Sequence, residues 1–553
     1  MNPSKPSPGA PAGAQPLHEI LRAQARRRPD HPAYLWYGAA LSYGELDRCS
    51  DAFAARLAAL GVRQGEPVAL FMQNCPQYVI AHYGIQKLGA VVCPCGPLNK
   101  AHELQYQLAD LGARVIVAAA PLLPVVDQVR AGTALAHVFV VHYADLLPAA
   151  PTIDLPEELA RLREAPRELP AGTEDFIAVM RTGAPAPQVT VDLHDTALMT
   201  YTSGTTGLPK GAMLSFDNAL YKTEVSVALY RVGDDDVMLA IAPLYHIAGM
   251  LMGVDMTIHA GATTVLLYRF DPKAVLQAIE RHRVSWWYSI APMNVAAMQV
   301  PGARDYDLGS LRLNPVTSFG ITFTEALAAQ WRGFAVNCAS YEAAYGLSET
   351  HTMDTIMPAD AVRWGTHGQA VPGTTIRIID PDTGRELPAG EQGEITLRGR
   401  GVFKGYWQKP EATAQTLRDG WVHTGDMGRL DADGYLSFMG RFKEMIKVSG
   451  YSVFPEEVEA ILVRHPAIAQ AGVIGVPDAD KGEVVKAFIV LEPALAADAR
   501  PTEAQVIAWA RENMAVYKVP RQVVFRDALP ATGAGKMLRR LLRDEPSLRD
   551  EQL

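Results

Sequence analysis

Cysteine is scarce in this sequence. Five of its 553 residues are Cys, scattered except for one close pair: Cys49, Cys75, Cys93, Cys95 and Cys338. Such a set excludes a disulfide framework, and a Cys-x-Cys pair without other Cys or His clusters is weak evidence for a metal site. Ordinary thiols in a reducing compartment are the simplest interpretation, so we expect a cytoplasmic protein.

An excess of positive charge is also lacking. The 51 Lys and Arg residues are outnumbered by 60 Asp and Glu residues, which gives a formal net charge of −9. A phosphate-binding surface for nucleic acid requires a basic excess, so this balance argues against nucleic acid as a main partner. A small anionic ligand in a locally basic cleft stays compatible with it.

No segment has the pattern of an export signal or of a membrane span. Residues 1–16 are rich in Pro, Gly and Ala and lack an apolar core, so we expect a disordered tail. The longest uncharged stretch, Val237–Val254, is interrupted by Pro243, His246 and Gly249 and ended by Asp255. A buried strand and turn fit this stretch better than an integral membrane segment; contact with a membrane through a surface patch stays open.

The first third of the chain alternates between two patterns. A helical pattern over 41–61 is followed by short apolar runs at 66–72, 89–94 and 113–120. Such runs are typical of buried parallel strands, and apolar residues, at 48% of the chain, suffice for sizeable cores. The sequence predicts an α/β fold with doubly wound sheets.

The last third has a different organisation. Strand-like segments at 375–380 and 393–399 are separated by Gly and Pro turns, which indicates a β-rich antiparallel subdomain. Beyond it we expect a helix from Pro455, strands at 471–476 and 484–491, and a helix at 502–514. These patterns predict an N-terminal body over 17–440 and a small α+β C-terminal domain over 441–553.

The segment TALMTYTSGTTGLPKGAML (196–214) carries the strongest chemical signal. Its small and polar side chains suit a phosphate cradle of backbone N–H groups, hydroxyls and one ammonium: Thr202, Ser203, Gly204, Thr205, Thr206, Gly207, Lys210 and Gly211. Taken alone, such a segment is better explained as a flexible surface loop. Pro209 stands where the Walker pattern requires Gly, so this is not an ordinary P-loop.

This segment resembles the phosphate loop of adenylate-forming enzymes, which include acyl- and aryl-CoA synthetases, adenylation domains and beetle luciferases. Four further segments resemble the family's motifs and follow in its order: AYGLSET (344–350), WVHTGD (421–426), GRFKEMIKVSGYSVFPEEVE (440–459) and LPATGAGKMLRRLLRD (529–544). The resemblance spans roughly residues 17–545. It implies a large AMP-binding body and a mobile C-terminal domain that carries a catalytic lysine.

The resemblance implies a nucleotide site. Tyr345 and Gly346 would border the adenine, and Ser348 keeps a hydroxyl where Thr is commoner in the family. Asp426 would accept hydrogen bonds from the ribose hydroxyls, and Arg441 would reach the same ribose. Taken alone, an Asp or Arg at these positions is better explained as a solvated surface charge.

The resemblance also implies the groups of the first chemical step. Glu349 offers a hard carboxylate oxygen for Mg²⁺. Lys536 would bridge the substrate carboxylate and the developing phosphoryl charge, although a lysine in a Gly-rich turn near a C-terminus is usually exposed and unimportant. His246, in APLYHIAGM, would orient the carboxylate; a satisfied core histidine is the alternative.

The second step of the family requires a rotation of the small domain. Lys443 stands at the family's hinge position, where many members have Asp. After rotation, Ser449, Gly450 and Tyr451 would face coenzyme A, with Gly450 leaving room for its pantetheine arm, and Lys447 would assist thioester formation.

The acyl pocket departs from the family. The usual Gly-Gly-Ala segment corresponds to Phe319, Gly320 and Ile321. Phe319 in place of Gly and Ile321 in place of Ala would narrow the pocket unless the register differs. Met-rich and aromatic runs at 250–256 and 285–290 suit a fatty or aryl tail, although such runs are more often plain core. Segment 242–250 contains no Asp, which disfavours an amino-acid substrate.

The resemblance therefore implies an ATP-dependent carboxylate–CoA ligase. Its substrates would be a medium- or long-chain fatty acid or an aryl acid, ATP with Mg²⁺, and coenzyme A. An acyl-AMP ligase that loads a carrier protein is the alternative within this class, and a degenerate acyl-binding protein is the non-enzymatic one. A homodimer is compatible with the resemblance.

Overall fold

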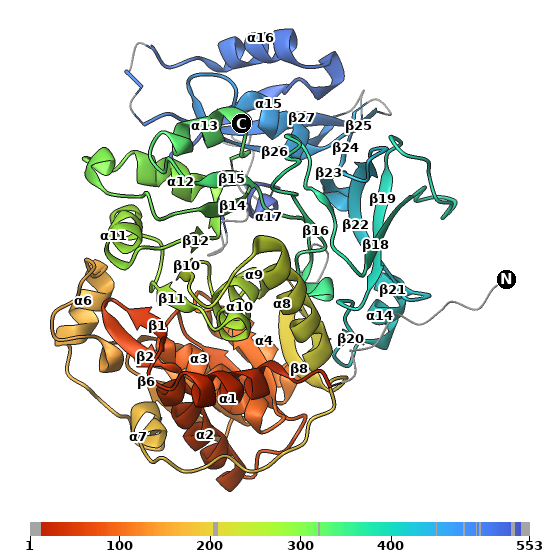
Figure 1. Ribbon diagram of the computed structural model, residues 1–553. Helices are drawn as coiled ribbons and strands as arrows, with labels where there is room; N and C mark the ends of the chain where they lie inside the picture. Colours follow the sequence, from red (N-terminus) through yellow and green to blue (C-terminus); the bar gives the residue numbers. More distant parts are fainter. Residues whose placement is uncertain are drawn as a thin grey trace.

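The computed structural model describes residues 13–202, 208–318, 321–448, 451–478, 482–493, 495–496, 499–531 and 537–543. Figure 1 shows α1 (Leu17–Arg27) and α2 (Tyr43–Ala59) at one end of the molecule. The elements of the last hundred residues gather at the other end. The fold class predicted from the sequence, a doubly wound α/β body with a β-rich part and a small α+β unit, is confirmed.

Within the described residues, the first large sheet has eight strands in the order β20-β9-β8-β4-β3-β5-β6-β7. Their bounds are β3 Pro67–Phe71, β4 Val91–Cys95, β5 Val115–Ala119, β6 His137–Val141, β7 Glu174–Asp175, β8 Thr196–Thr202, β9 Lys210–Ser215 and β20 Gly405–Tyr406. The expected strands at 66–72, 89–94 and 113–120 are β3, β4 and β5. They pair in parallel and are almost wholly buried, as continuous apolar runs predict.

The second large sheet also has eight strands, in the order β13-β14-β12-β10-β11-β1-β2, with β15 beside β14. Their bounds are β1 Pro32–Trp36, β2 Ala39–Ser42, β10 Val237–Ala240, β11 Thr263–Leu266, β12 Trp286–Trp287, β13 Ser289–Ile290, β14 Leu313–Thr317 and β15 Ala339–Glu342. Apart from the hairpin of β1 and β2, all of its pairs are parallel.

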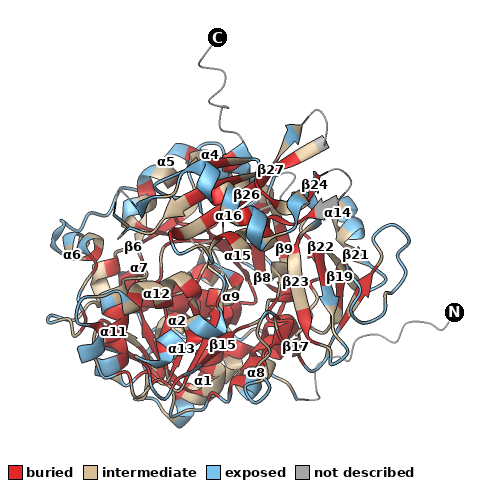
Figure 2. Cartoon of the chain, turned by 90° about the horizontal axis from the view of Figure 1, so that it is seen from above, coloured by how far each residue is buried: buried red, intermediate tan, exposed pale blue. Residues whose placement is uncertain are grey.

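Helices cover both sheets, and Figure 2 shows buried strands enclosed by helices with exposed outer faces. The helices of the body are α3 Pro76–Lys87, α4 Ala101–Leu111, α5 Leu123–Arg130, α6 Glu157–Glu164, α7 Phe176–Met180, α8 Phe216–Tyr230, α11 Pro272–His282, α12 Ala291–Met298, α13 Glu325–Arg332 and α14 Pro410–Thr416. The helix expected over 41–61 is α2. It begins at a capping box in which Ser42 accepts from the N–H of Glu45 and Glu45 accepts from the N–H of Ser42.

The antiparallel β structure expected near 376–440 is present. It consists of β18 Thr374–Ile379, β19 Gly393–Gly399, β21 Leu417–Arg418, β22 Trp421–Leu430 and β23 Leu436–Arg441, and a short pair joins β16 Thr355–Ile356 to β17 Gln369–Ala370. The last unit holds β24 Ile446–Val448, β25 Tyr451–Val453, α15 Pro455–Leu462, β26 Ile468–Asp478, β27 Gly482–Leu491, α16 Glu503–Asn513, β28 Gln522–Phe525 and α17 Arg539–Arg543. Every element expected there is found.

Separate cores lie on either side of residue 441. The largest apolar cluster runs from Leu17 to Leu436, whereas a smaller one lies wholly between Ile446 and Val523. The proposed boundary at 440/441 and the mobility of the smaller unit stay predictions. Of the expected N-terminal tail, residues 1–12 lie outside the described part of the chain.

The buried strand and turn expected for Val237–Val254 are both found. Strand β10 is followed by a turn at Leu244 and Tyr245. A helix that was not expected comes next: it starts as α9 (Ile247–Met250), passes through a π-helical turn at Leu251–Asp255 and continues as α10 (Met256–Ala260). Asp255 lies inside this helix, where its side chain is buried with a carboxylate oxygen 4.0 Å from Nε2 of His82. Burial raises the pKa of Asp255 well above its ordinary value, because the charged carboxylate loses its hydration inside the protein. Among the described residues, none forms a helix that is both long and apolar enough to cross a membrane.

Candidate active site

Four of the predicted site segments follow the carboxyl ends of sheet strands. The phosphate loop begins where β8 ends, PLYH follows β10, residues 318–323 follow β14, and AYGLSET follows β15. Ligands of open α/β sheets bind at this edge. The topology therefore brings segments more than a hundred residues apart to the same side of their sheets.

Tyr406 links the phosphate-loop lysine to the predicted metal ligand. Strand β20 pairs with β9, which places Tyr406 opposite Ala212 and its ring 4.6 Å from Nζ of Lys210. The Tyr406 hydroxyl donates a hydrogen bond to Oε1 of Glu349 at 2.6 Å. Tyr406 thus contacts both an ammonium, which can bind phosphate, and a carboxylate, which can bind a metal ion.

Glu349 fits a magnesium ion that is shared with a nucleotide. Among the described residues, no group of three His, Cys, Asp or Glu side chains could hold a metal ion by itself. Mg²⁺ is usually bound through one or two carboxylates together with substrate phosphates and water, so a single half-buried carboxylate beside Lys210 suits it.

Tyr345, Asp426 and Arg441 converge on one point. The Tyr345 hydroxyl donates to Oδ2 of Asp426 at 2.7 Å, and Nε of Arg441 lies 3.2 Å from Oδ1. Asp426 and Arg441 are directly opposite in the antiparallel pair of β22 and β23. The ring of Tyr345 stacks on Phe438 with 5.7 Å between centroids, which orients its flat face.

Gly346 is required by a close backbone approach. A Cβ at this position would overlap the backbone nitrogen of Met353 and lie 2.9 Å from Cα of Thr352. The chain therefore doubles back directly behind the predicted adenine motif. Ser348, Glu349 and Thr350 form a short 3-10 turn in this bend, and all three residues after them have positive φ angles.

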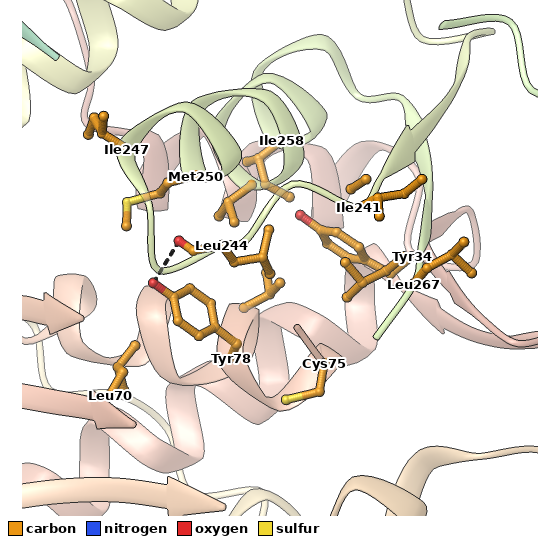
Figure 3. Close-up of a cluster of buried hydrophobic side chains, with 14 of the residues drawn as sticks. Tyr34, Leu70, Cys75, Tyr78, Ile241, Leu244, Ile247, Met250, Ile258 and Leu267 are labelled. Atoms are coloured by element: carbon orange, nitrogen blue, oxygen red, sulfur yellow. Dashed lines mark hydrogen bonds between the residues drawn. The ribbon is translucent and has the colours of Figure 1, made fainter. Parts of the chain in front are cut away.

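Helix α3 holds the PLYH segment in place (Figure 3). Tyr78 donates its hydroxyl proton to the carbonyl of Leu244 at 2.9 Å, and the Asn74 side chain accepts from the Leu244 N–H at 2.8 Å. His246, two residues later, is exposed at the start of α9. This placement excludes the alternative of a core histidine, while its role beside a substrate stays a prediction.

The residues that flank PLYH are apolar, with one anchored phenol. An apolar packing gap with no room for a water molecule is lined by Leu239, Ala240, Ile241, Ala242, Gly249, Met252, Gly253 and Tyr288. Tyr288 and Thr317 share a hydrogen bond of 3.0 Å between their hydroxyls. Most other members of the two Met-rich and aromatic runs, such as Trp286 and Met256, are plain core.

A buried glutamate anchors the loop after β14. Oε1 of Glu342 accepts from the N–H of Ser318 at 3.1 Å, and Oε2 accepts from the Ser318 hydroxyl. Burial raises the pKa of Glu342 from 4.5 to about 7. Ile321 follows in this loop and packs against a small cluster that includes Phe323; its narrowing of the acyl pocket stays a prediction.

The expected hinge lies at the junction of the two cores. Lys443 and Lys447 are both exposed there. Glu444 is bound by Arg539, which also contacts Glu456 and Glu459 on α15. The segment that follows the expected catalytic lysine is therefore tied to the residue next to the hinge.

Several predicted site residues lie outside the described part of the chain. They are Ser203, Gly204, Thr205, Thr206, Gly207, Phe319, Gly320, Ser449, Gly450 and Lys536, together with the side chain of Tyr451. Their roles stay predictions. Thr202 is described, and its hydroxyl donates to the Lys210 carbonyl at 3.5 Å.

Two family models match this chain. The model of the AMP-binding enzyme matches residues 21–407, and that of the AMP-binding enzyme C-terminal domain matches 457–536. The chain belongs to the AMP-binding enzyme family. The resemblance to adenylate-forming enzymes is thereby confirmed.

Relatives of this AMP-binding enzyme cover nearly its whole length. It is 34% identical to the long-chain-fatty-acid–CoA ligase of Bacillus subtilis, over 96% of this chain and 94% of the relative. It is 35% identical to a feruloyl-CoA synthase of an Amycolatopsis species, over 93% and 96%. The solved structure of the anthranilate CoA ligase AuaEII in complex with anthranoyl-AMP is similar with a TM-score of 0.83 and 28% identity, over 97% and 98%.

Some residues at the site could not be found from the motifs. Four such residues contact a predicted site segment or the turn behind it, although none belongs to a recognised motif: Tyr406, Lys222, Asp354 and Glu342. Their contacts arise from strand pairing and helix packing between distant segments. No local pattern signals them.

Proposed function

We propose that this chain is an AMP-forming acyl-CoA ligase that acts on a fatty or aryl carboxylic acid. The observation that supports this best is the joint assembly of two groups of side chains. One is Lys210 with Tyr406 and Glu349, suited to phosphates and Mg²⁺; the other is Tyr345 with Asp426 and Arg441, suited to a nucleoside. The relatives named above are CoA ligases or synthases, which favours coenzyme A as the acceptor.

In the first step, a carboxylate oxygen of the acid attacks the α-phosphorus of ATP. The bond from this phosphorus to the bridging oxygen breaks, pyrophosphate leaves, and acyl-AMP forms. Lys210 would hold the phosphates, and Lys536 would bridge the carboxylate and the developing phosphoryl charge. Bound Mg²⁺ would neutralise phosphate charge, with Glu349 as its protein ligand.

In the second step, the thiol of coenzyme A loses its proton and the sulfur attacks the acyl carbonyl. The bond to the AMP phosphate breaks, so AMP leaves and the thioester remains. Rotation about Lys443 would first remove Lys536 and then bring Lys447, Ser449, Gly450 and Tyr451 to the site. His246 would orient the acyl group in both steps.

The class of acid is proposed from the apolar side chains next to PLYH. Met252, Tyr288 and aliphatic side chains from β10 line the packing gap there. Apolar side chains with one phenol suit a substrate with a fatty or aryl tail better than a substrate with a charged tail. A panel of short, medium and long fatty acids and aryl acids would identify the substrate.

Release of AMP and pyrophosphate from the acid and ATP, with and without coenzyme A, tests the activity. We expect pyrophosphate exchange without coenzyme A and thioester only with it. Thioester on a carrier protein but not on coenzyme A would favour the carrier-protein ligase instead. Absence of exchange across the whole acid panel would favour a degenerate acyl-binding protein. Cytoplasmic localisation and a homodimer also belong to this proposal, and fractionation and analytical ultracentrifugation test them.

A further inference from the structure

The turn behind Glu349 has an unusual backbone. His351, Thr352 and Met353 have φ angles of +57°, +53° and +48° in succession. Among the described residues, no other three successive non-glycine residues share this left-handed conformation. Side chains with a Cβ adopt it at a cost, so the surrounding contacts must hold the turn in place.

Lys222, on the buried face of α8, supplies those contacts. Its Nζ donates to the carbonyl of Met353 at 3.0 Å and to Oδ1 of Asp354 at 2.7 Å. The other carboxylate oxygen of Asp354 accepts from the hydroxyl of Thr350. Lys222 and Asp354 are 0% and 2% exposed, so the ion pair is shielded from water on all sides.

Segment 401–403 closes over this ion pair. A Cβ on Gly401 would overlap Cε of Lys222 and lie 2.8 Å from the carbonyl of Thr350. Two residues later, the N–H of Phe403 donates to the carbonyl of Glu349 at 2.8 Å. Glu349 is therefore fixed on one side by Phe403 and on the other by the turn that Lys222 holds.

We propose that the buried Lys222–Asp354 pair positions Glu349 for Mg²⁺ by holding this left-handed turn. Lys222 acts through the turn and is a positioning residue; it is not a ligand of the metal. The inference rests on the proposed function, because that function assigns the metal to Glu349. Without the pair, the three residues relax toward ordinary angles and the Glu349 carboxylate leaves its orientation against Tyr406.

The test is the double variant K222M/D354L. Replacing both partners avoids an unpaired buried carboxylate, which the single variant K222M would leave and which endangers folding. The first readout is the affinity for Mn²⁺, which electron paramagnetic resonance measures in the presence of a non-hydrolysable ATP analogue. The second is the Mg²⁺ concentration at half-maximal pyrophosphate exchange. We expect both to weaken by about tenfold or more, as with other groups that orient metal ligands.

Lys87 provides a matched control. It is equally buried and bonds Asp47 and Asp51 between α3 and α2, away from the turn. We expect K87M to lower the melting temperature and to leave the affinity for Mn²⁺ unchanged. We also expect K222M/D354L to convert supplied acyl-AMP to thioester at the wild-type rate, because that step follows pyrophosphate release.

A folded K222M/D354L protein with wild-type Mn²⁺ affinity overturns the inference. An equal loss of affinity in K87M overturns it as well, because the effect would then follow general destabilisation. Failure of the proposed function has a different signature, which is the absence of pyrophosphate exchange in the unaltered protein with every acid. The Mn²⁺ measurement remains decisive for the positioning role in that case.

Discussion

The hydroxyl of Tyr345 donates a hydrogen bond to Asp426 at 2.7 Å, which joins two motifs that lie 81 residues apart. Both side chains are buried, and Arg441 completes the group from the neighbouring strand. Burial and the neighbouring Asp426 carboxylate raise the pKa of Tyr345 well above its ordinary value, so the phenol stays a donor at every physiological pH.

From this contact we predict a loss of nucleotide binding in Asp426→Ala. The variant removes the proposed acceptor for the ribose hydroxyls and leaves Tyr345 and Arg441 without their shared partner. Hydrogen bonds to charged groups contribute about 1.5–3 kcal/mol, so affinity for an ATP analogue should fall by roughly 10- to 150-fold in calorimetry. Asp433→Ala, in the exposed turn between β22 and β23, serves as control and should bind normally. Wild-type affinity in Asp426→Ala would exclude the ribose role.

A second prediction separates the two half-reactions. Lys536→Ala should nearly abolish pyrophosphate exchange, because no ammonium then bridges the carboxylate and the α-phosphate. It should leave thioester formation from supplied acyl-AMP within a few-fold of the wild type. The exposed Lys273, paired with Asp154, gives a control in which Lys273→Ala changes neither step. Equal losses in both half-reactions would contradict the assignment of Lys536.

Glu342 leads to a prediction about pH and stability. Burial raises its pKa from 4.5 to about 7, so between these values the folded protein holds a proton that the unfolded chain has released. The free energy of unfolding should therefore fall as pH rises from 4.5 to 7. The loss from this residue is on the order of 3 kcal/mol and is complete above pH 7.

Glu342→Gln keeps an acceptor for the N–H of Ser318 and cannot ionise. We expect the stability difference between the variant and the wild type to grow in favour of the variant across pH 4.5–7. Denaturant titrations at pH 5, 6, 7 and 8 measure it, and comparing the two proteins cancels the contributions of other buried acids. A difference that stays constant with pH would mean that Glu342 titrates normally.

The motifs singled out Tyr345, Asp426 and Arg441, which lie together in the structure, but they did not predict how these side chains contact one another. Tyr345 and Asp426 each belong to a recognisable motif, whereas the hydrogen bond between them depends on how β22 packs against the segment AYGLSET (344–350). Tyr406 bonds Glu349 because β20 pairs with β9, a pairing between segments nearly two hundred residues apart. Such contacts come from tertiary packing, and local pattern carries no information about them.

Secondary structure was predictable where periodicity was strong. The continuous apolar runs that form β3, β4 and β5 are typical of parallel strands buried on both faces. The helix over 247–260 was not expected, because Gly249 and Asp255 disfavour a helix in isolation. In the fold, Asp255 is buried with a raised pKa and Gly249 is required by its contact with the preceding loop, so tertiary packing overrides local preference.

That contact at Gly249 yields the last prediction. A Cβ there would overlap the carbonyl oxygen of Pro243 and lie 2.9 Å from that of Ala242, so α9 packs directly on the backbone of the PLYH segment. Gly249→Ala must push this segment away and displace His246 at its end. Overpacking of this kind costs about 1–3 kcal/mol of stability, and kcat/KM for the acid should fall more than that for ATP. At Gly233 a Cβ would meet nothing within 4 Å. Gly233→Ala should therefore retain both stability and activity. If Gly249→Ala has the same melting temperature and the same kcat/KM for the acid as Gly233→Ala, the proposed placement of His246 beside the acid is wrong.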